Sequence, residues 1–331
     1  MPALTATTAL SSNSPLGPTP CAFNGLWIAL VTPFKNGLVD HPALAALTAR
    51  LRADGVSGFV ACGSTGEAAA LNKAEQFQVL ETVLEAAGDA PVVMGLSGYH
   101  LGQMVEQVQA MAPYPLAGLL VSAPHYIRPS QDGLLHWFRA VADASAVPVI
   151  IYDIPYRTGA TLSADTLLEL AEHPRIQAIK DCGGDGAKTL RLIADGRLQV
   201  LTGEDAQIFN TLALGGAGAI SASAHWQTPR FVELMHWFRV GDLPQARRIW
   251  QALQPWIDAC FSEPNPAPLK AMLAGVGALH NELRAPMMAA SGPLQTRLQA
   301  LKDQIERNGA VGAADAADVG RATHATGLSP R

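Results

Sequence analysis

A lysine closes the apolar segment IQAIK, residues 176–180, and two glycines follow almost at once in DCGGD. A lysine at the end of a strand is ordinarily a solvated charge. Burial at such a place would instead lower its pKa, because an apolar environment disfavours the ammonium form. The neutral amine could then attack a ketone and form a carbinolamine and a Schiff base. Whether Lys180 is such a nucleophile depends on the residues that end the other apolar segments.

Three other segments end in residues that suit this chemistry. GSTGE supplies Ser64 and Thr65 between glycines, whose exposed backbone N–H groups could hold a carboxylate. YDIPYRTG supplies Tyr152 and Arg157, and APHYIRPSQDG supplies Tyr126. A tyrosine acting through a hydroxyl can move the protons that imine and enamine formation require. An arginine can bind a substrate carboxylate through two parallel hydrogen bonds. Each residue alone would equally suit a turn, a packing position or a surface ion pair, so the inference requires that they lie together.

Eight short apolar segments recur along the chain, and each is followed by a stretch with helical periodicity. They are residues 26–33, 55–64, 91–97, 117–124, 147–155, 176–180, 198–203 and 217–221. Ser130 and Ser163 stand where two of the helices need N-caps. Continuous apolar character is typical of parallel strands covered on both faces. The pattern favours an α/β fold, a TIM (β/α)8 barrel, over a doubly wound sheet, whose GxGxxG signature is absent from the first strand-to-helix turn. In such a barrel the strands end at one face, which would bring the candidate residues together.

The chain divides into four parts by composition. We expect a mobile N-terminal tail over 1–22, the barrel over 23–228, a C-terminal helical region over 229–307 and a low-complexity tail over 308–331. The first part lacks the pattern of a signal peptide, and the last has few large apolar residues. No apolar run approaches the length of a membrane span. These features predict a cytoplasmic protein.

Composition narrows the class of ligand. With 49% hydrophobic and 15% charged residues, the 331-residue chain can bury a large core. A net charge of −5 disfavours nucleic acid or an anionic membrane as a partner, so we expect a small-molecule substrate. The four cysteines form no CxxC pair and the nine histidines no HExxH motif, which disfavours a zinc-dependent aldolase. We expect neither a metal nor an organic cofactor, because the lysine imine would supply the electron sink.

The quoted motifs resemble those of the dihydrodipicolinate synthase and N-acetylneuraminate lyase family of pyruvate-dependent class I aldolases, over about Phe23 to Ala290. YDIPYRTG is similar to the Tyr-Asn-Val-Pro-Ser-Arg-Thr-Gly of the synthase branch, and AIKDCGGD to its Schiff-base strand. LTGEDAQIFNTLALGGAGAISA is similar to its seventh and eighth strands, and EPNPAPLKAML with LRAPM to its C-terminal region. The resemblance implies the barrel and a pyruvate aldolase activity.

The resemblance also implies a role for each candidate residue. Lys180 would bind pyruvate as the imine, and Tyr152 would donate and accept protons above it. Ser64 stands at the place of the relay threonine. Thr65 would hold the pyruvate carboxylate with its hydroxyl and its backbone N–H. Tyr126 would complete the proton relay from a neighbouring subunit, so the resemblance implies self-association, as a homotetramer built from two dimers.

The second substrate and the pocket walls are implied in the same way. Arg157 would bind the carboxylate of the aldehyde, and Gly203 and Ile220 would line the pocket on the seventh and eighth strands. Two departures weaken the branch assignment: Ser64 replaces the usual threonine of the synthases, and Asp153 replaces their usual asparagine. The assignment therefore depends on Arg157 and on EPNPAPLK.

Three functions remain open at this point. The leading hypothesis is condensation of pyruvate with L-aspartate 4-semialdehyde on the route to diaminopimelate and lysine, because Arg157 suits an aldehyde that carries its own carboxylate and amine. The alternative is another pyruvate-dependent lyase or hydratase-aldolase that acts on a sugar acid or an aromatic substrate. The third is a non-catalytic binding barrel, which would have no need of an imine-forming lysine.

Feedback inhibition by lysine is expected to be weak or absent. Family members that lysine inhibits resemble one another in polar groups, commonly serine and histidines, just after the GE of GSTGE. Here those places hold Ala68, Lys73 and Gln76. The Lys73 ammonium would repel the ammonium groups of a lysine ligand. A titration of the enzyme should show little inhibition by lysine, and strong inhibition at sub-millimolar lysine would overturn the expectation.

Overall fold

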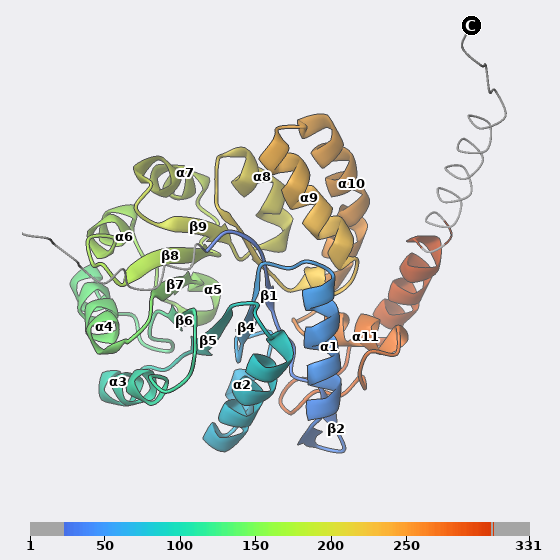
Figure 1. The fold of residues 1–331 in the computed structure, drawn as a ribbon, viewed down its shortest axis with the longest axis horizontal. Helices are drawn as coiled ribbons and strands as arrows, with labels where there is room; N and C mark the ends of the chain where they lie inside the picture. Colours follow the sequence, from blue (N-terminus) through green and yellow to red (C-terminus); the bar gives the residue numbers. More distant parts are fainter. Residues whose placement is uncertain (1–22, 306, 308–331) are drawn as a thin grey trace, which may run out of the picture.

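The computed structural model describes residues 23–305 and 307, so the predicted tails over 1–22 and 308–331 lie outside the described residues. Eight parallel strands close a barrel in the order β1-β10-β9-β8-β7-β6-β5-β4 (Figure 1). They are β1 Gly25–Ala29, β4 Gly58–Ala61, β5 Val92–Leu96, β6 Gly118–Ser122, β7 Val149–Asp153, β8 Ile176–Asp181, β9 Gln199–Thr202 and β10 Gly218–Ser221. Each strand overlaps one of the eight predicted apolar segments, and the predicted TIM barrel is confirmed.

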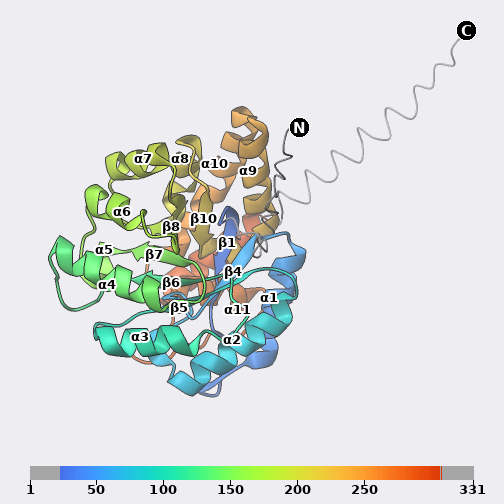
Figure 2. The same cartoon turned by 60° about the vertical axis from the view of Figure 1, so that its left-hand side comes forward.

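Helices form a layer around the outside of the barrel, as the turned view shows (Figure 2). They are α1 His41–Ala53, α2 Lys73–Ala87, α3 Leu101–Ala110, α4 Gln131–Ala144, α5 Pro155–Thr158, α6 Ala164–Leu170, α7 Gly186–Asp195, α8 Ile208–Ala213 and α9 Thr228–Val240. The two predicted N-caps are confirmed, because the Ser130 and Ser163 side chains accept hydrogen bonds from the backbone N–H groups of Gly133 and Thr166. Three short 3₁₀ turns lie at Ala68–Ala70, Asp205–Gln207 and Ser223–His225.

Alternation along each strand decides which side chains enter the barrel. Ala178 and Tyr152 belong to the hydrophobic cluster inside the barrel, whereas Ile179 belongs to the larger cluster between the strands and the helices. Lys180 follows Ile179, so its side chain points inward again. The parallel register pairs Tyr152 with Lys180. The fold therefore places these two side chains next to each other inside the barrel mouth.

The residues that follow Tyr152 and Lys180 point outward and are tied to α7. Asp153 is fully buried and forms an ion pair with Lys188 of α7, with 2.5 Å between Oδ2 and Nζ. Asp181, its register partner, accepts a hydrogen bond from the Thr189 hydroxyl at 2.5 Å. A Cβ on Gly183 would lie only 2.5 Å from the Lys188 Nζ, so a larger residue there would displace the ion pair. The helix thus fixes the ends of β7 and β8 from behind.

A C-terminal helical region follows the barrel. It comprises α10 Leu243–Cys260, α11 Ala267–Gly275 and a last helix over 292–305. α9 packs against β1, α10 against α9, and α11 against α10. The predicted division between barrel and helical region at 228/229 falls at the start of α9, the helix that follows the last barrel strand. None of the helices in residues 23–305 is long and apolar enough to cross a membrane.

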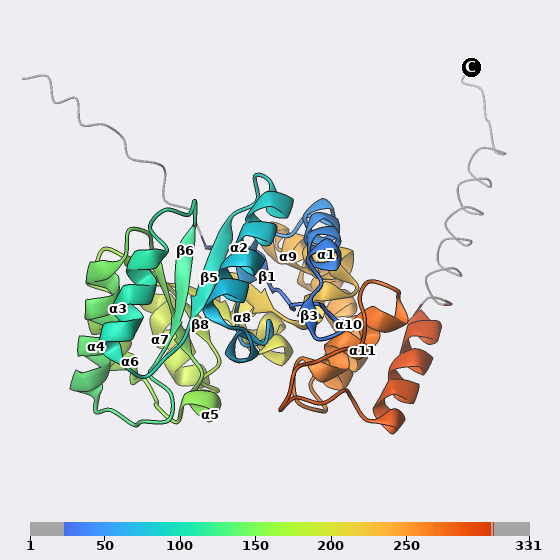
Figure 3. The ribbon, with the colours of Figure 1, turned by 90° about the horizontal axis from the view of Figure 1, so that it is seen from below.

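A small antiparallel hairpin, which the sequence analysis did not predict, links the barrel to this region. It consists of β2 Phe34–Lys35 and β3 Leu38–Val39, directly after β1. The backbone N–H groups of Asn36 and Gly37 donate to the Glu282 carboxylate at 2.9 and 2.6 Å. Seen from below, β3 lies beside the C-terminal helices (Figure 3). The hairpin therefore joins the amino-terminal strand to residues close to the end of the described chain.

Candidate active site

Lys180 has the environment that a nucleophilic amine requires. Its side chain is enclosed in the barrel mouth, with the residue only 5% exposed, and its Nζ lies 4.5 Å from the centre of the Tyr152 ring. No carboxylate of the described residues forms an ion pair with it. Burial therefore lowers the pKa of Lys180 from its usual value of 10.5. A larger share of the amine is neutral near pH 7 than for an exposed lysine.

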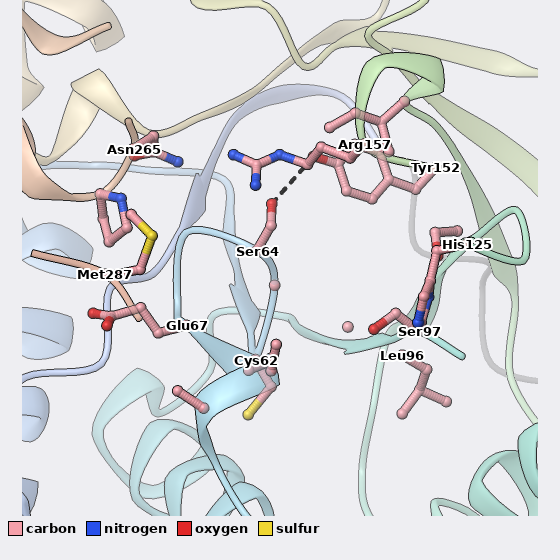
Figure 4. A pocket seen from close by; sticks show the side chains of 18 of the residues that line it. Cys62, Ser64, Glu67, Leu96, Ser97, His125, Tyr152, Arg157, Asn265 and Met287 are labelled. Atoms are coloured by element: carbon pink, nitrogen blue, oxygen red, sulfur yellow. Dashed lines mark hydrogen bonds between the residues drawn. The ribbon is translucent and has the colours of Figure 1, made fainter. Parts of the chain in front are cut away.

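Tyr152 and Ser64 form a polar pair beside that amine. The Tyr152 hydroxyl lies 3.3 Å from the Ser64 hydroxyl, and either oxygen can donate (Figure 4). The two residues are 88 positions apart, on β7 and on the turn after β4. Burial raises the pKa of Tyr152, so the phenol keeps its proton. The pair can hold and pass a proton next to Lys180.

The turn that carries Ser64 is tightly constrained. Cys62 and Glu67 at its two ends adopt the left-handed region, with φ of 54° and 52°. Between them the Gly66 N–H donates to the Gly63 carbonyl at 3.0 Å. A Cβ on Gly66 would lie 2.9 Å from the Leu30 carbonyl oxygen, so a larger residue would push the turn away from β1. Residues 62–67 therefore hold one shape.

That shape leaves donors free at the centre of the turn. In the part of the chain that the structure describes, the backbone N–H groups of Ser64 and Thr65 donate to no protein group. The Thr65 side chain is buried, and its Oγ1 accepts a hydrogen bond from the Asn265 amide at 2.9 Å. Adjacent free N–H groups in a turn are a common binding place for an anion. The geometry suits a carboxylate held beside Ser64.

A cavity of about 410 Å³ opens over the turn and the strand ends. Its lining includes Ser64, Glu67, Ser97, His125, Tyr152, Arg157, Asn265, Arg284 and Met287. Arg157, which α5 carries, extends toward Ser64 in Figure 4. Lys180 is not among the lining residues, since it lies behind the Tyr152 ring. Thr65 is not among the lining residues either, although its neighbour Ser64 is. A substrate in this cavity has the Arg157 guanidinium and the Ser64 and Tyr152 hydroxyls within one space.

Gly203 and Ile220 lie next to the site without lining the cavity. Gly203 follows β9, and a Cβ there would lie 2.4 Å from both the Lys180 Cε and the Cys182 Sγ. Glycine at this position is therefore what leaves room for the lysine side chain. Ile220 is buried in the cluster inside the barrel that also contains Tyr152. It supports the floor beneath the site.

Tyr126 lies apart from the other candidates. It follows β6, is 90% exposed and has a φ of 71°. None of its contacts in the described residues joins it to Ser64 or Tyr152. Its neighbour His125 lines the cavity and packs edge to face on Tyr99. The role predicted for Tyr126, in a relay across a subunit interface, stays a prediction.

Sequence reasoning missed the attachment of the C-terminal region to the turn. Glu67 forms an ion pair with Lys270 of α11 at 2.5 Å, with their side chains 2% and 0% exposed. The backbone N–H of Arg284 donates to the other Glu67 oxygen at 3.1 Å, and its guanidinium binds both oxygens of Glu75. Lys270 and Arg284 both lie over the Phe34 ring, at 4.2 and 4.6 Å from its centre. EPNPAPLKAML and LRAPM were the only signals, and they indicated family likeness without a contact.

Comparison with known proteins gives a consistent result. Residues 22–305 match the Dihydrodipicolinate synthetase family. The chain is 35% identical over 278 residues to "4-hydroxy-tetrahydrodipicolinate synthase 2" of Clostridium acetobutylicum, and the aligned part covers 83% of this chain and 97% of the relative. It is 33% identical over 293 residues to the 4-hydroxy-tetrahydrodipicolinate synthase of Thermodesulfovibrio yellowstonii, with 87% and 99% covered. The crystal structure of dihydrodipicolinate synthase from Aquifex aeolicus superposes with a TM-score of 0.83 at 30% identity, over 86% of this chain and 98% of that one.

Proposed function

The chain belongs to the dihydrodipicolinate synthetase family, and from that premise we propose that it is a 4-hydroxy-tetrahydrodipicolinate synthase. The enzyme is a class I aldolase that condenses pyruvate with L-aspartate 4-semialdehyde in the biosynthesis of diaminopimelate and lysine. The observation that carries the proposal is the buried Lys180 amine, 4.5 Å from the centre of the Tyr152 ring, whose hydroxyl lies 3.3 Å from Ser64.

The first half of the reaction activates pyruvate. The neutral Nζ of Lys180 attacks the ketone carbon, and the carbinolamine loses water to give the imine. Loss of a proton from the methyl group then gives the enamine. Tyr152 donates and accepts these protons, with Ser64 as its relay and Tyr126 of a neighbouring subunit as the next member. The free N–H groups and hydroxyl of Thr65 hold the pyruvate carboxylate, which orients the ketone toward the amine.

The second half joins the two substrates. The enamine carbon attacks the aldehyde carbon, and the aldehyde oxygen takes a proton and becomes the 4-hydroxyl group. Arg157 binds the carboxylate of the aldehyde substrate through its guanidinium. The amine of the same substrate then attacks the imine carbon, closes the ring and releases Lys180 as the free amine. One water leaves in each complete turnover, and neither a metal nor an organic cofactor is required.

The assembly and the place of action follow from the same proposal. The enzyme is a homotetramer, built as a dimer of dimers. A neighbouring subunit covers Tyr126, because a large aromatic side chain is rarely as exposed as the 90% of Tyr126. Its partners are otherwise small molecules, and it acts in the cytoplasm, where amino acids are synthesised.

Reductive trapping tests the proposed function. The enzyme is incubated with pyruvate, reduced with borohydride and analysed by intact mass and peptide mapping, and unreduced enzyme is assayed with L-aspartate 4-semialdehyde. We expect one adduct, on Lys180, and turnover of the aldehyde. An adduct on Lys180 without turnover of this aldehyde would move the assignment to another pyruvate-dependent lyase or hydratase-aldolase. Absence of any adduct would overturn the aldolase mechanism itself.

A further inference from the structure

The hydroxyl of Thr65 accepts a hydrogen bond from the protein but donates none to it. A hydroxyl has one hydrogen and two lone pairs. The Asn265 Nδ2 donates to Thr65 Oγ1 at 2.9 Å, although the two residues are 200 positions apart. Within the described residues the Thr65 hydroxyl donates to no acceptor. Its proton is thus available to a ligand.

Two more donors without an acceptor lie in the same turn. The backbone N–H groups of Ser64 and Thr65 make no hydrogen bond to the described protein. Thr65 is buried and Ser64 is half-buried at the cavity, so these donors can be paired by a ligand that enters there. Three such donors on adjacent groups are therefore arranged for an anion. Whether the third one points at that anion depends on Asn265, since a hydroxyl rotates to suit its neighbours.

The chain segment that carries Asn265 is fixed relative to the turn. Asn265 stands two residues before α11, whose Lys270 pairs with Glu67 of the same turn at 2.5 Å. The turn and the amide are therefore fixed to each other by a buried contact that is independent of the amide itself. In Figure 4 the amide lies at the edge of the cavity with its nitrogen toward the interior. The Asn265 Nδ2 meets Thr65, and the Oδ1 of the same amide is buried without a hydrogen-bond partner in the described residues.

We propose that Asn265 is a positioning residue that commits the Thr65 hydroxyl to donate to the carboxylate of pyruvate. By occupying a lone pair of Oγ1, the amide leaves the hydroxyl hydrogen free to be donated to an anion beside the turn. An acceptor in the same place would have the opposite effect, because the hydroxyl would turn and donate to it. The inference rests on the proposed imine between pyruvate and Lys180, but the identity of the aldehyde does not enter it.

The test measures the pyruvate dependence of imine trapping, with no aldehyde present. Wild type is compared with Asn265→Ala, Asn265→Asp, Thr65→Val and the double variant Asn265→Ala/Thr65→Val. Asn265→Ala should raise the pyruvate concentration for half-maximal trapping by about tenfold, the usual size of one hydrogen bond to a charged group. Asn265→Asp, which is of equal size, should raise it further, because the new carboxylate takes the hydroxyl proton and repels the substrate. At saturating pyruvate all four variants should still label Lys180.

The double variant separates positioning from a direct contact or a general loss of structure. If Asn265 acts through Thr65, Asn265→Ala should have no further effect once Thr65 is replaced by valine. Asn281→Ala provides a matched control, since Asn281 lies in the same C-terminal region but not at this cavity. Its pyruvate dependence should equal that of wild type, and thermal unfolding should show all variants folded.

The outcomes distinguish this inference from the function on which it rests. The inference would be overturned, with the aldolase left intact, if the wild type traps pyruvate and Asn265→Ala and Asn265→Asp show the same pyruvate dependence of trapping. Equal effects of Asn265→Ala with and without Thr65 would also overturn it. A wild-type enzyme that gives no adduct would overturn both.

Discussion

Replacement of Lys180 with methionine is expected to give a protein that forms no imine with pyruvate, has no aldolase turnover and unfolds at a higher temperature than wild type. The first two effects follow from loss of the amine, for which no other described side chain at the cavity can substitute. The third follows from burial, because the residue is 5% exposed and no described carboxylate pairs with it. Methionine fills similar space without a charge to desolvate. Activity and stability thus conflict at this position.

The gain in stability should depend on pH in a definite direction. Burial lowers the pKa of Lys180 in the folded chain below its unfolded value. As the pH falls below the unfolded pKa, the unfolded chain takes up the proton first, so the lysine destabilises the fold. The destabilisation by the lysine reaches its full size once the pH is below the pKa of the folded chain. The difference in Tm between Lys180→Met and wild type should therefore be large near pH 7 and shrink toward pH 10.5.

Thermal unfolding at these two pH values, together with trapping and turnover assays, provides the check. Lys35→Met, at an exposed lysine of the β2–β3 hairpin, is the control and should change neither stability nor activity. A Lys180→Met variant that retained a pyruvate adduct, or that lost stability near neutral pH, would contradict this account of the site.

Replacement of Lys270 with methionine is expected to lower the free energy of unfolding by about 3–5 kcal/mol, the usual effect of removing one partner of a buried ion pair. Glu67 would be left 2% exposed without its cation. Because Glu67 ends the turn that carries Thr65, binding of pyruvate should weaken as well. Lys270→Met combined with Glu67→Gln should regain much of the stability, since no buried charge is then left unpaired.

Denaturant unfolding of the two single variants and the double variant measures the coupling between the partners. The exposed pair Arg139–Glu169, at 2.7 Å with side chains 44% and 46% exposed, supplies a matched control. Arg139→Met should cost less than about 1 kcal/mol, because solvent screens a surface pair. If Lys270→Met were no more costly than Arg139→Met, the Lys270–Glu67 pair would stabilise the turn no more than a surface ion pair does.

The barrel could be predicted because its signal is local and repeated. The strands consist mainly of apolar residues, as in β5 Val92–Leu96, and several helices begin with a capping side chain, such as Ser130 before α4 and Ser163 before α6. The placement of Lys180 and Tyr152 at one face followed from the same pattern, since the strands of such a barrel all end at that face. The β2–β3 hairpin was missed because two-residue strands carry no periodicity.

The contacts that complete the site could not be predicted in this way. Lys188 lies on a helix, where a lysine usually faces solvent, yet it is buried against Asp153 from another unit of the barrel. Asn265 belongs to a motif that matched the family, but nothing in its neighbours indicates Thr65. A sequence pattern shows which residues are buried and not which residues from distant elements meet. Such pairs become visible only when the barrel closes and the C-terminal region packs on it.

The sequence separation of those contacts sets an order in time. Translation proceeds from the amino end at ~5–20 residues per second, so about 10–40 seconds pass between synthesis of Thr65 and of Asn265, 200 residues later. Arg284, which contacts Glu67 and Glu75, is made later still. A chain still attached to the ribosome can therefore already contain Lys180 and Tyr152 before Asn265 and Arg284, which contact the turn that receives pyruvate, have been made. Competence for pyruvate is acquired only near the end of translation.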